Sequence, residues 1–332
     1  MTSNAVSRHF ATVPVTATHY PWLVADVGGT NARFGWVDGP GAEVREVRTL
    51  PVADFAEPVL AVRAYLAELA VAPGSDHRQP RWAAIAVATA AHDDIVDLTN
   101  SHWRFSRAAL AADLGLDGLL VLNDFEALAL SLPRLKPAQI RSHGRPIPLP
   151  GTLAVIGPGT GLGVAAVVPS RAGWVPLPGE GGHATLAPGD DFESALLARV
   201  RSRFEHVSAE RLLSGIGLPV LHGAVAEVLG VRAGNLGAEA VVELGLEGGD
   251  PTCERTLDVF CALLGSFAGN VALTLGARGG VFIGGGIVPR LGERFEAKGR
   301  QRPYLEAIPT ALITDTLAAL SGAALAIEQH QP

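Results

Sequence analysis

The 332-residue sequence has only two cysteines and lacks any unbroken run of eighteen apolar residues. Cys253 and Cys261 lie eight positions apart, which fits neither a CxxC motif, a zinc site nor a disulfide framework. Such sparse cysteine is typical of a reducing compartment. Because the first twenty residues also lack an apolar core of the kind that secretion signals carry, we expect a cytoplasmic protein with no membrane partner.

Lysine is nearly absent, since Lys136 and Lys298 are the only two and neither follows a glycine. A P-loop requires GKS or GKT, so that class of nucleotide site is excluded. The sequence also lacks HExxH and GxSxG, which argues against zinc proteases and serine hydrolases. The net charge of −7 offers no basic stripe for a phosphate backbone, so we expect no nucleic-acid partner.

The length is sufficient for about two domains, and 48% hydrophobic with 18% charged residues is typical of a compact globular enzyme. Two segments, 22–37 and 152–168, share the order strand, Gly/Thr turn, strand, which predicts two similar α/β cores. We therefore divide the chain into an N-terminal extension 1–21, a smaller lobe 22–133, a Pro-rich linker 134–150 and a larger lobe 151–332, whose C-terminal helix is free to return to the smaller lobe.

Apolar periodicity predicts further elements between these segments. A helix is expected to begin at a cap on Asp54, with Glu57 at its third position and apolar residues recurring from Phe55 to Leu69. The other predicted elements are strands at 83–88, 119–122 and 279–283, and helices at 125–132 and 261–275.

Three glycine-rich turns, at 28–29, 157–163 and 284–286, each follow a predicted strand. Glycine lets backbone N–H groups approach an anion, although any one of these turns alone is more simply a tight hairpin. Three together, two of them with a threonine (Thr30 and Thr160), favour a site for nucleotide phosphates. A Rossmann GxGxxG motif is excluded, because none of these turns has glycine at the sixth position.

Two acidic residues lie at the ends of apolar strands. Asp124 follows Asn123 where a strand gives way to a helix, and it could simply cap that helix. If a hydroxyl substrate binds there, Asp124 can instead accept its proton during phosphoryl transfer. Asp26, beside the first glycine turn, could orient Mg²⁺ through water.

Carboxylates and an imidazole also occur in a second region. Glu180 and His183 lie in the loop Pro178-Gly179-Glu180-Gly181-Gly182-His183, and Glu210 follows Ser208, which is predicted to open a helix. Such groups can grip vicinal sugar hydroxyls, although each alone is more simply a loop histidine or a favourable helix N-terminal charge.

Six blocks in order, spanning about 22 to 325, resemble bacterial glucokinases of the non-ROK type. These blocks are residues 26–33 (DVGGTNAR), 123–125 (NDF), 157–163 (GPGTGLG), 177–183 (LPGEGGH), 208–211 (SAER) and 284–289 (GGGIVP). The resemblance implies an α/β, two-lobed actin-like ATPase (ribonuclease H-like) fold with a central cleft. It also implies transfer of the ATP γ-phosphoryl group to O6 of D-glucose with Mg²⁺, in a cytoplasmic homodimer.

By the same resemblance, Asp124 is the general base. Glucose is held by Asn123, Asp124, Glu180, His183 and Glu210. The nucleotide-binding positions are Ala25, Asp26, Val27, Gly28, Gly29, Thr30, Asn31, Gly157, Gly159, Thr160, Gly161, Gly284, Gly285 and Gly286, with the last three near the adenosine.

Three features depart from the family pattern. Ala90 and Asp93 replace the usual proline and glycine in loop 88–94, the stretch after Pro289 is shorter, and residues 1–21 have no counterpart. The altered loop leaves two alternatives open: a kinase of a related hexose or amino sugar, and a catalytically silent sugar sensor. A repressor is disfavoured, because about twenty residues before the first glycine turn are too few for a DNA-binding segment.

Overall fold

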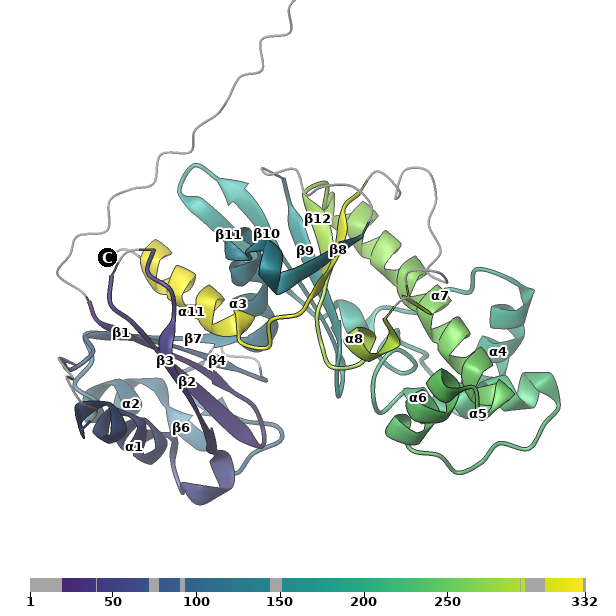
Figure 1. Cartoon of the computed structure of the whole chain (residues 1–332), viewed down its shortest axis with the longest axis horizontal. Coiled ribbons are helices and arrows are strands. Elements are labelled where there is room, and N and C mark those ends of the chain that lie inside the picture. Colours follow the sequence, from purple (N-terminus) through teal and green to yellow (C-terminus); the bar gives the residue numbers. More distant parts are fainter. Residues whose placement is uncertain are drawn as a thin grey trace, which may run out of the picture. The chain divides into compact units, whose positions relative to one another are not determined.

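The computed structural model describes residues 20–39, 41–71, 78–89, 93–143, 151–292, 294–295 and 308–330. The chain forms two compact units (Figure 1). Unit 1 takes the described residues up to Arg134, together with Val167–Pro176 and the C-terminal segment from Leu317. Unit 2 takes Leu135–Ala166 and Leu177–Thr316. Loop residues 90–92 and most of the N-terminal extension lie outside the described residues.

The sheet of unit 1 has the strand order β3-β2-β1-β4-β7. Its strands are β1 (Trp22–Val27), β2 (Asn31–Val37), β3 (Arg45–Pro51), β4 (Trp82–Val87) and β7 (Gly118–Asn123). The predicted hairpin is confirmed, because β1 and β2 pair antiparallel around the first glycine turn. The predicted strands 83–88 and 119–122 are confirmed as β4 and β7, and the parallel register of β1, β4 and β7 brings the carboxyl ends of these three strands to one edge.

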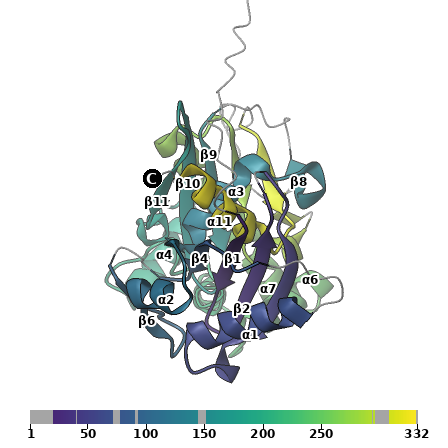
Figure 2. The same ribbon diagram turned by 90° about the vertical axis from the view of Figure 1, so that its left-hand side faces the viewer.

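Alternating apolar residues of β1 bury both faces of this sheet. Leu23 and Ala25 join a core with α1 (Pro58–Val71) and α2 (Arg107–Asp113), whereas Trp22 and Val24 join one with α11 (Ala318–Gln329). Figure 2 shows α11 beside α3 (Asp124–Ser131). These two helices approach closely at Gly322, where an added Cβ would lie 1.7 Å from the Ala127 carbonyl oxygen.

The predicted start of α1 at Asp54 is wrong. Val52–Asp54 form a short 3-10 turn, Phe55 is extended, and the helix begins at Pro58. Proline disfavours a helical conformation in the residue before it, yet its fixed φ suits the first helical turn. The helix therefore starts at the proline, and the apolar positions Val59, Val62 and Leu69 are buried as the periodicity predicts.

A second sheet has the order β11-β10-β9-β12-β13-β8, and most of its residues belong to unit 2. Its strands are β8 (Ile140–His143), β9 (Leu153–Pro158), β10 (Leu162–Ser170), β11 (Gly173–Gly179), β12 (Gly280–Ile283) and β13 (Thr310–Ile313). The second strand–turn–strand segment is confirmed by β9 and β10, and the strand at 279–283 by β12. Strand β8 lies within the predicted linker 134–150 and pairs antiparallel with β13, a pairing that the prolines around it do not indicate.

Helices α4 (Asp191–Arg201), α5 (Leu218–Leu229) and α6 (Ala238–Glu247) gather around the first half of α7 (Pro251–Leu275), as Figure 1 shows. Helix α7 begins ten residues before the predicted Cys261, because the Asp250 carboxylate caps the N–H groups of Thr252 and Cys253. It is long and apolar enough to cross a membrane, but 61% of its apolar window is buried, as in the core helix of a globular domain.

Both cysteines are buried thiols on α7. Burial raises the pKa of Cys253 to about 11, with a further contribution from the nearby Asp250 carboxylate. The thiol therefore stays protonated and unreactive at neutral pH.

Candidate active site

The first glycine turn, at the carboxyl end of β1, is packed against a loop of the same unit. The Gly28 N–H donates to the Asn31 carbonyl oxygen at 2.9 Å. A Cβ on Gly29 would lie 2.4 Å from the Asn100 carbonyl oxygen, so only glycine fits this approach. Thr30 is exposed at the tip. The backbone of 28–30 thus forms a tight turn with Thr30 exposed to solvent.

Asp26 lies on β1 directly opposite Arg33 on β2. Its Oδ2 accepts a hydrogen bond from Arg33 Nη1 at 3.0 Å. Burial raises the pKa of the Asp26 carboxyl, and the Arg33 guanidinium offsets part of this effect by favouring the charged form. From the sequence we predicted that Asp26 orients Mg²⁺ through water, and we did not predict its ion pair with Arg33.

Asn123 and Asp124 occupy the junction of β7 and α3. The cap of α3 is Asn123, whose Oδ1 accepts from the Phe125 N–H at 2.9 Å and whose Nδ2 donates to the Thr89 carbonyl oxygen at 3.3 Å. The half-buried Asp124 also accepts from the Phe125 N–H, at 2.9 Å, through Oδ1. Asn123 is therefore the N-cap residue, and Asp124 is the first residue of the helix, where a negative charge interacts favourably with the helix dipole.

The other two glycine turns meet at one edge of the second sheet. Strands β9 and β12 run parallel with Ile156 opposite Ile283, so the turns that follow them are neighbours. Gly285 has a φ of +79°, and a Cβ there would lie 2.4 Å from the Pro158 carbonyl oxygen. A cleft of about 410 Å³ opens beside both turns, and we call it the Gly159 cleft. It is lined by Gly159, Thr160, Gly215, Leu218, Ala238, Glu239, Val242, Gly286, Ile287 and Arg290.

Glu210 lies against the second glycine turn. Its Oε2 accepts from the Leu162 N–H at 2.8 Å, and a Cβ on Gly161 would lie 2.5 Å from the same oxygen. Its own N–H donates to the Gly182 carbonyl oxygen at 2.9 Å. The predicted helix opening at Ser208 is wrong, because residues 208–217 form successive turns and the next helix is α5.

The loop with Glu180 and His183 also packs against the second glycine turn. Gly182 is essential to this approach, since a Cβ there would lie 2.0 Å from the Leu162 carbonyl oxygen. The Glu180 and His183 side chains are exposed, with Oε2 and Nε2 3.8 Å apart. Both can therefore turn toward a ligand at little cost.

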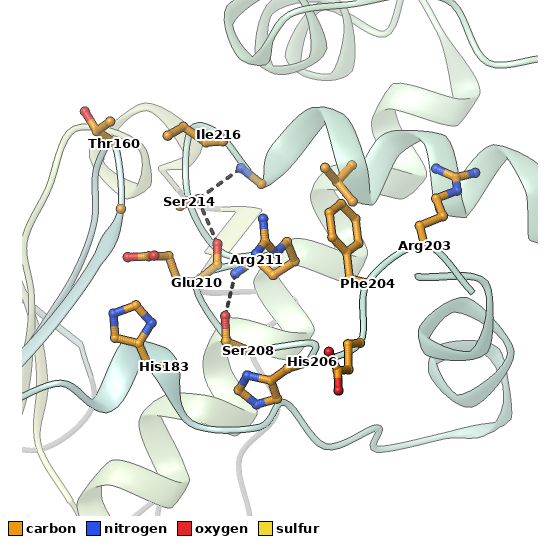
Figure 3. Close-up of a pocket in the computed structure, with 14 residues that line it drawn as sticks. Thr160, His183, Arg203, Phe204, His206, Ser208, Glu210, Arg211, Ser214 and Ile216 are labelled. Atoms are coloured by element: carbon orange, nitrogen blue, oxygen red, sulfur yellow. Dashed lines mark hydrogen bonds between the residues drawn. The ribbon is translucent and has the colours of Figure 1, made fainter. Parts of the chain in front are cut away.

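Figure 3 shows His183 and Glu210 near Thr160, at one end of a cleft of about 510 Å³ that we call the Glu210 cleft. Its other end contains residues that sequence reasoning missed. Arg211 stacks on the Phe204 ring, 4.5 Å from its centroid. Arg203, Glu205, His206 and Ile216 also line the cleft. None belongs to a motif that we interpreted, apart from Arg211 in the SAER block, so no local signal marked them.

The described residues contain no group of three or more His, Cys, Asp or Glu side chains placed to hold a metal. Asp26 offers one carboxylate, and its Oδ2 is bonded to Arg33. This donor set fits Mg²⁺ that is held mainly by nucleotide phosphates and water, because Mg²⁺ usually keeps several waters beside one or two carboxylates.

The chain matches known proteins over nearly its whole length. A family model described as Glucokinase matches residues 23–330. A glucokinase of Chromobacterium violaceum is 47% identical, covering 94% of this chain and 90% of that protein. A glucokinase of Paramagnetospirillum magneticum is also 47% identical, with coverage of 91% and 96%.

The crystal structure of a glucokinase from an Antarctic psychrotroph has a TM-score of 0.85 and 36% identity, covering 93% of this chain and 99% of that one. Such a likeness assigns this chain the α/β actin-like ATPase fold of sugar kinases, as the sequence resemblance implied. Together with the match of the family model over residues 23–330, it shows that the chain belongs to the glucokinase family.

Proposed function

We propose that this protein transfers the γ-phosphoryl group of ATP to O6 of D-glucose, giving glucose 6-phosphate and ADP. Membership of the glucokinase family supports the reaction. The observation that carries the residue assignment is the junction of β7 and α3, where Asn123 caps the helix and the Asp124 carboxylate lies in the first turn. A half-buried carboxylate at such a position suits a general base.

In the proposed mechanism, the 6-hydroxyl oxygen of glucose attacks the γ-phosphorus of ATP while Asp124 accepts the hydroxyl proton. The bond from the γ-phosphorus to the β–γ bridging oxygen breaks, and ADP leaves. Glu180, His183 and Glu210 hold sugar hydroxyls by hydrogen bonds, which fixes the acceptor for an in-line approach. Mg²⁺, bound to the nucleotide phosphates and near Asp26, would supply neutralisation of phosphate charge. Asn123 places a side-chain amide next to the proposed base, Asp124. The same amide donates a hydrogen bond to the Thr89 carbonyl oxygen and so fixes residues 88–89.

The nucleotide assignment rests on the glycine turns. The backbone of 25–31 and of 157–161 would bind phosphates, because both segments form tight turns at strand ends. The Gly159 cleft would receive the adenosine near 284–286, where Leu218, Ala238, Val242 and Ile287 provide an apolar lining.

The proposal includes Mg²⁺ as cofactor, a cytoplasmic location and a homodimer, which rest on the family resemblance.

Purified protein incubated with ATP, Mg²⁺ and glucose should yield glucose 6-phosphate and ADP, identified by ³¹P and ¹³C NMR. The Asp124→Asn variant should bind glucose but form product far more slowly. ATP hydrolysis that is independent of sugar, or phosphorylation at another hydroxyl, would refute the assignment.

A further inference from the structure

The turn 214–217 lies between the two clefts of unit 2. Ser214, Ile216 and Gly217 line the Glu210 cleft, whereas Gly215 lines the Gly159 cleft. Thr160 lines both. In the proposed function these clefts receive the sugar and the nucleotide, so this turn is shared by the two substrates.

Ser214 ties this turn to Glu210. Its side chain is buried, with 1% of the residue exposed. Its Oγ donates to the Glu210 carbonyl oxygen at 2.8 Å and accepts from the Gly217 N–H at 3.0 Å (Figure 3). One hydroxyl therefore fixes both the backbone of the sugar-side carboxylate and the end of the turn.

The same turn continues to the second glycine turn. The Gly215 N–H donates to the Gly159 carbonyl oxygen at 2.8 Å, and the Gly159 N–H donates to the Gly161 carbonyl oxygen at 2.9 Å. The Glu210 carboxylate then returns to this segment through the Leu162 N–H. These bonds form a closed circuit in which Glu210, Ser214 and the glycine turn hold one another.

We infer that Ser214 is a positioning residue that supports both sugar binding in the Glu210 cleft and nucleotide binding in the Gly159 cleft. This inference rests on the proposed function. Without the hydroxyl, the Glu210 backbone and the 215–217 turn lose their common anchor, so both ligands meet a less ordered site. A residue that served the sugar side alone would affect one ligand only.

The test measures dissociation constants for glucose and, separately, for a non-hydrolysable ATP analogue by calorimetry with the full chain. Loss of a typical hydrogen bond changes an equilibrium about five-fold. Ser214→Ala should therefore raise the dissociation constants of both ligands by about five-fold or more. Ser194→Ala is the matched control. Its hydroxyl also donates to the carbonyl four residues earlier at 2.8 Å, but Ser194 lies on α4 and lines neither cleft. We expect it to change neither constant.

The inference would be overturned if Ser214→Ala weakened the binding of glucose alone, of the nucleotide alone, or of neither ligand. If circular dichroism shows that Ser214→Ala does not fold, Ser214→Cys, which keeps a similar volume with weaker hydrogen bonding, decides by the same criterion. A wild-type protein that binds neither ligand would refute the proposed function itself. Wild-type binding of both ligands, together with unchanged binding of both by the Ser214 variant, would refute only the shared positioning role.

Discussion

The Glu210 carboxylate and the Leu162 backbone N–H are joined by a hydrogen bond of 2.8 Å, which fastens a candidate sugar ligand to a candidate phosphate-binding turn. Both oxygens of a carboxylate can accept, so Glu210 can hold the turn through Oε2 and a sugar hydroxyl through Oε1. Glu210 therefore has a structural role beside the sugar-binding role that we propose for it.

These two roles of Glu210 can be separated by substitution. Glu210→Gln keeps a side-chain oxygen that can accept from Leu162, so it should raise the KM for glucose with little change in melting temperature. Glu210→Ala also loses the anchor of the turn, and a hydrogen bond to a charged group contributes about 1.5–3 kcal/mol. Thermal unfolding should then show a clear destabilisation in the alanine variant only. Equal melting temperatures for both variants would contradict the anchoring role.

Asp124→Asn should reduce kcat by about 100-fold or more, because it removes the group that accepts the hydroxyl proton. Glucose affinity should change only modestly, since the amide still offers an oxygen. Glu126→Gln, in the same first turn of α3, is the matched control for charge at the helix N-terminus. We expect it to retain turnover. Steady-state kinetics with direct glucose binding measure both quantities, and near-normal turnover of Asp124→Asn would remove the residue from its role.

Asn123 has two contacts that different substitutions separate. Asn123→Ser can keep the cap of α3 but cannot reach the Thr89 carbonyl, so it should raise the sugar KM while preserving stability. Asn123→Ala should also lose about 1 kcal/mol of folding stability through the lost cap. Steady-state kinetics measure the sugar KM of each variant, and chemical denaturation measures its free energy of unfolding. A serine variant as unstable as the alanine variant would show that the Thr89 contact, rather than the cap, supports the fold.

The Asp26–Arg33 pair predicts a pH-dependent effect. Because the folded-state pKa of Asp26 is raised, its contribution to stability is largest at low pH and is lost as pH rises above its unfolded value of about 3.9. Arg33 limits that loss by favouring the ionised form. Arg33→Gln should therefore destabilise the protein more at pH 7 than near pH 4. Arg104→Gln, from the well-exposed pair with Asp97, is the control and should show little effect.

For that pH series, chemical denaturation across the range gives the free energy of unfolding. A destabilisation by Arg33→Gln that is the same at every pH would show that the guanidinium does not act through the charge of Asp26.

Much of the scaffold was predictable because its signals are local. Strand, glycine turn and strand are contiguous in both hairpins, and the junction at Asn123 and Asp124 is readable from an apolar run followed by a cap residue. The glycine turns after β9 and β12 could be predicted as turns. Their adjacency follows only from strand pairing across more than a hundred residues.

The failures arise where distant contacts or a single proline override local pattern. Residues 208–211 resemble a helix start, yet Thr185 pairs with Ser208 in a β-bridge and the Ala209 N–H donates to the Ala184 carbonyl oxygen, which commits the segment to turns. Likewise, Pro58 resets the start of α1. The hydrogen bond that the Leu162 N–H donates to Glu210 depends on where distant segments meet, so no sequence motif indicated it. The pairing of Arg33 with Asp26 depends on the exact register of the β1–β2 hairpin, which the sequence prediction did not specify.

The central claim is tested most directly by the ATP-dependent phosphorylation of glucose, mannose, fructose, glucosamine and N-acetylglucosamine by the purified protein with Mg²⁺, compared by kcat/KM. We predict a clear preference for glucose, with turnover that depends on Asp124. Preference for another sugar would retain phosphoryl transfer and contradict the glucose assignment. Absence of turnover on every sugar, with sugar binding intact, would contradict the proposed kinase and indicate a sugar sensor.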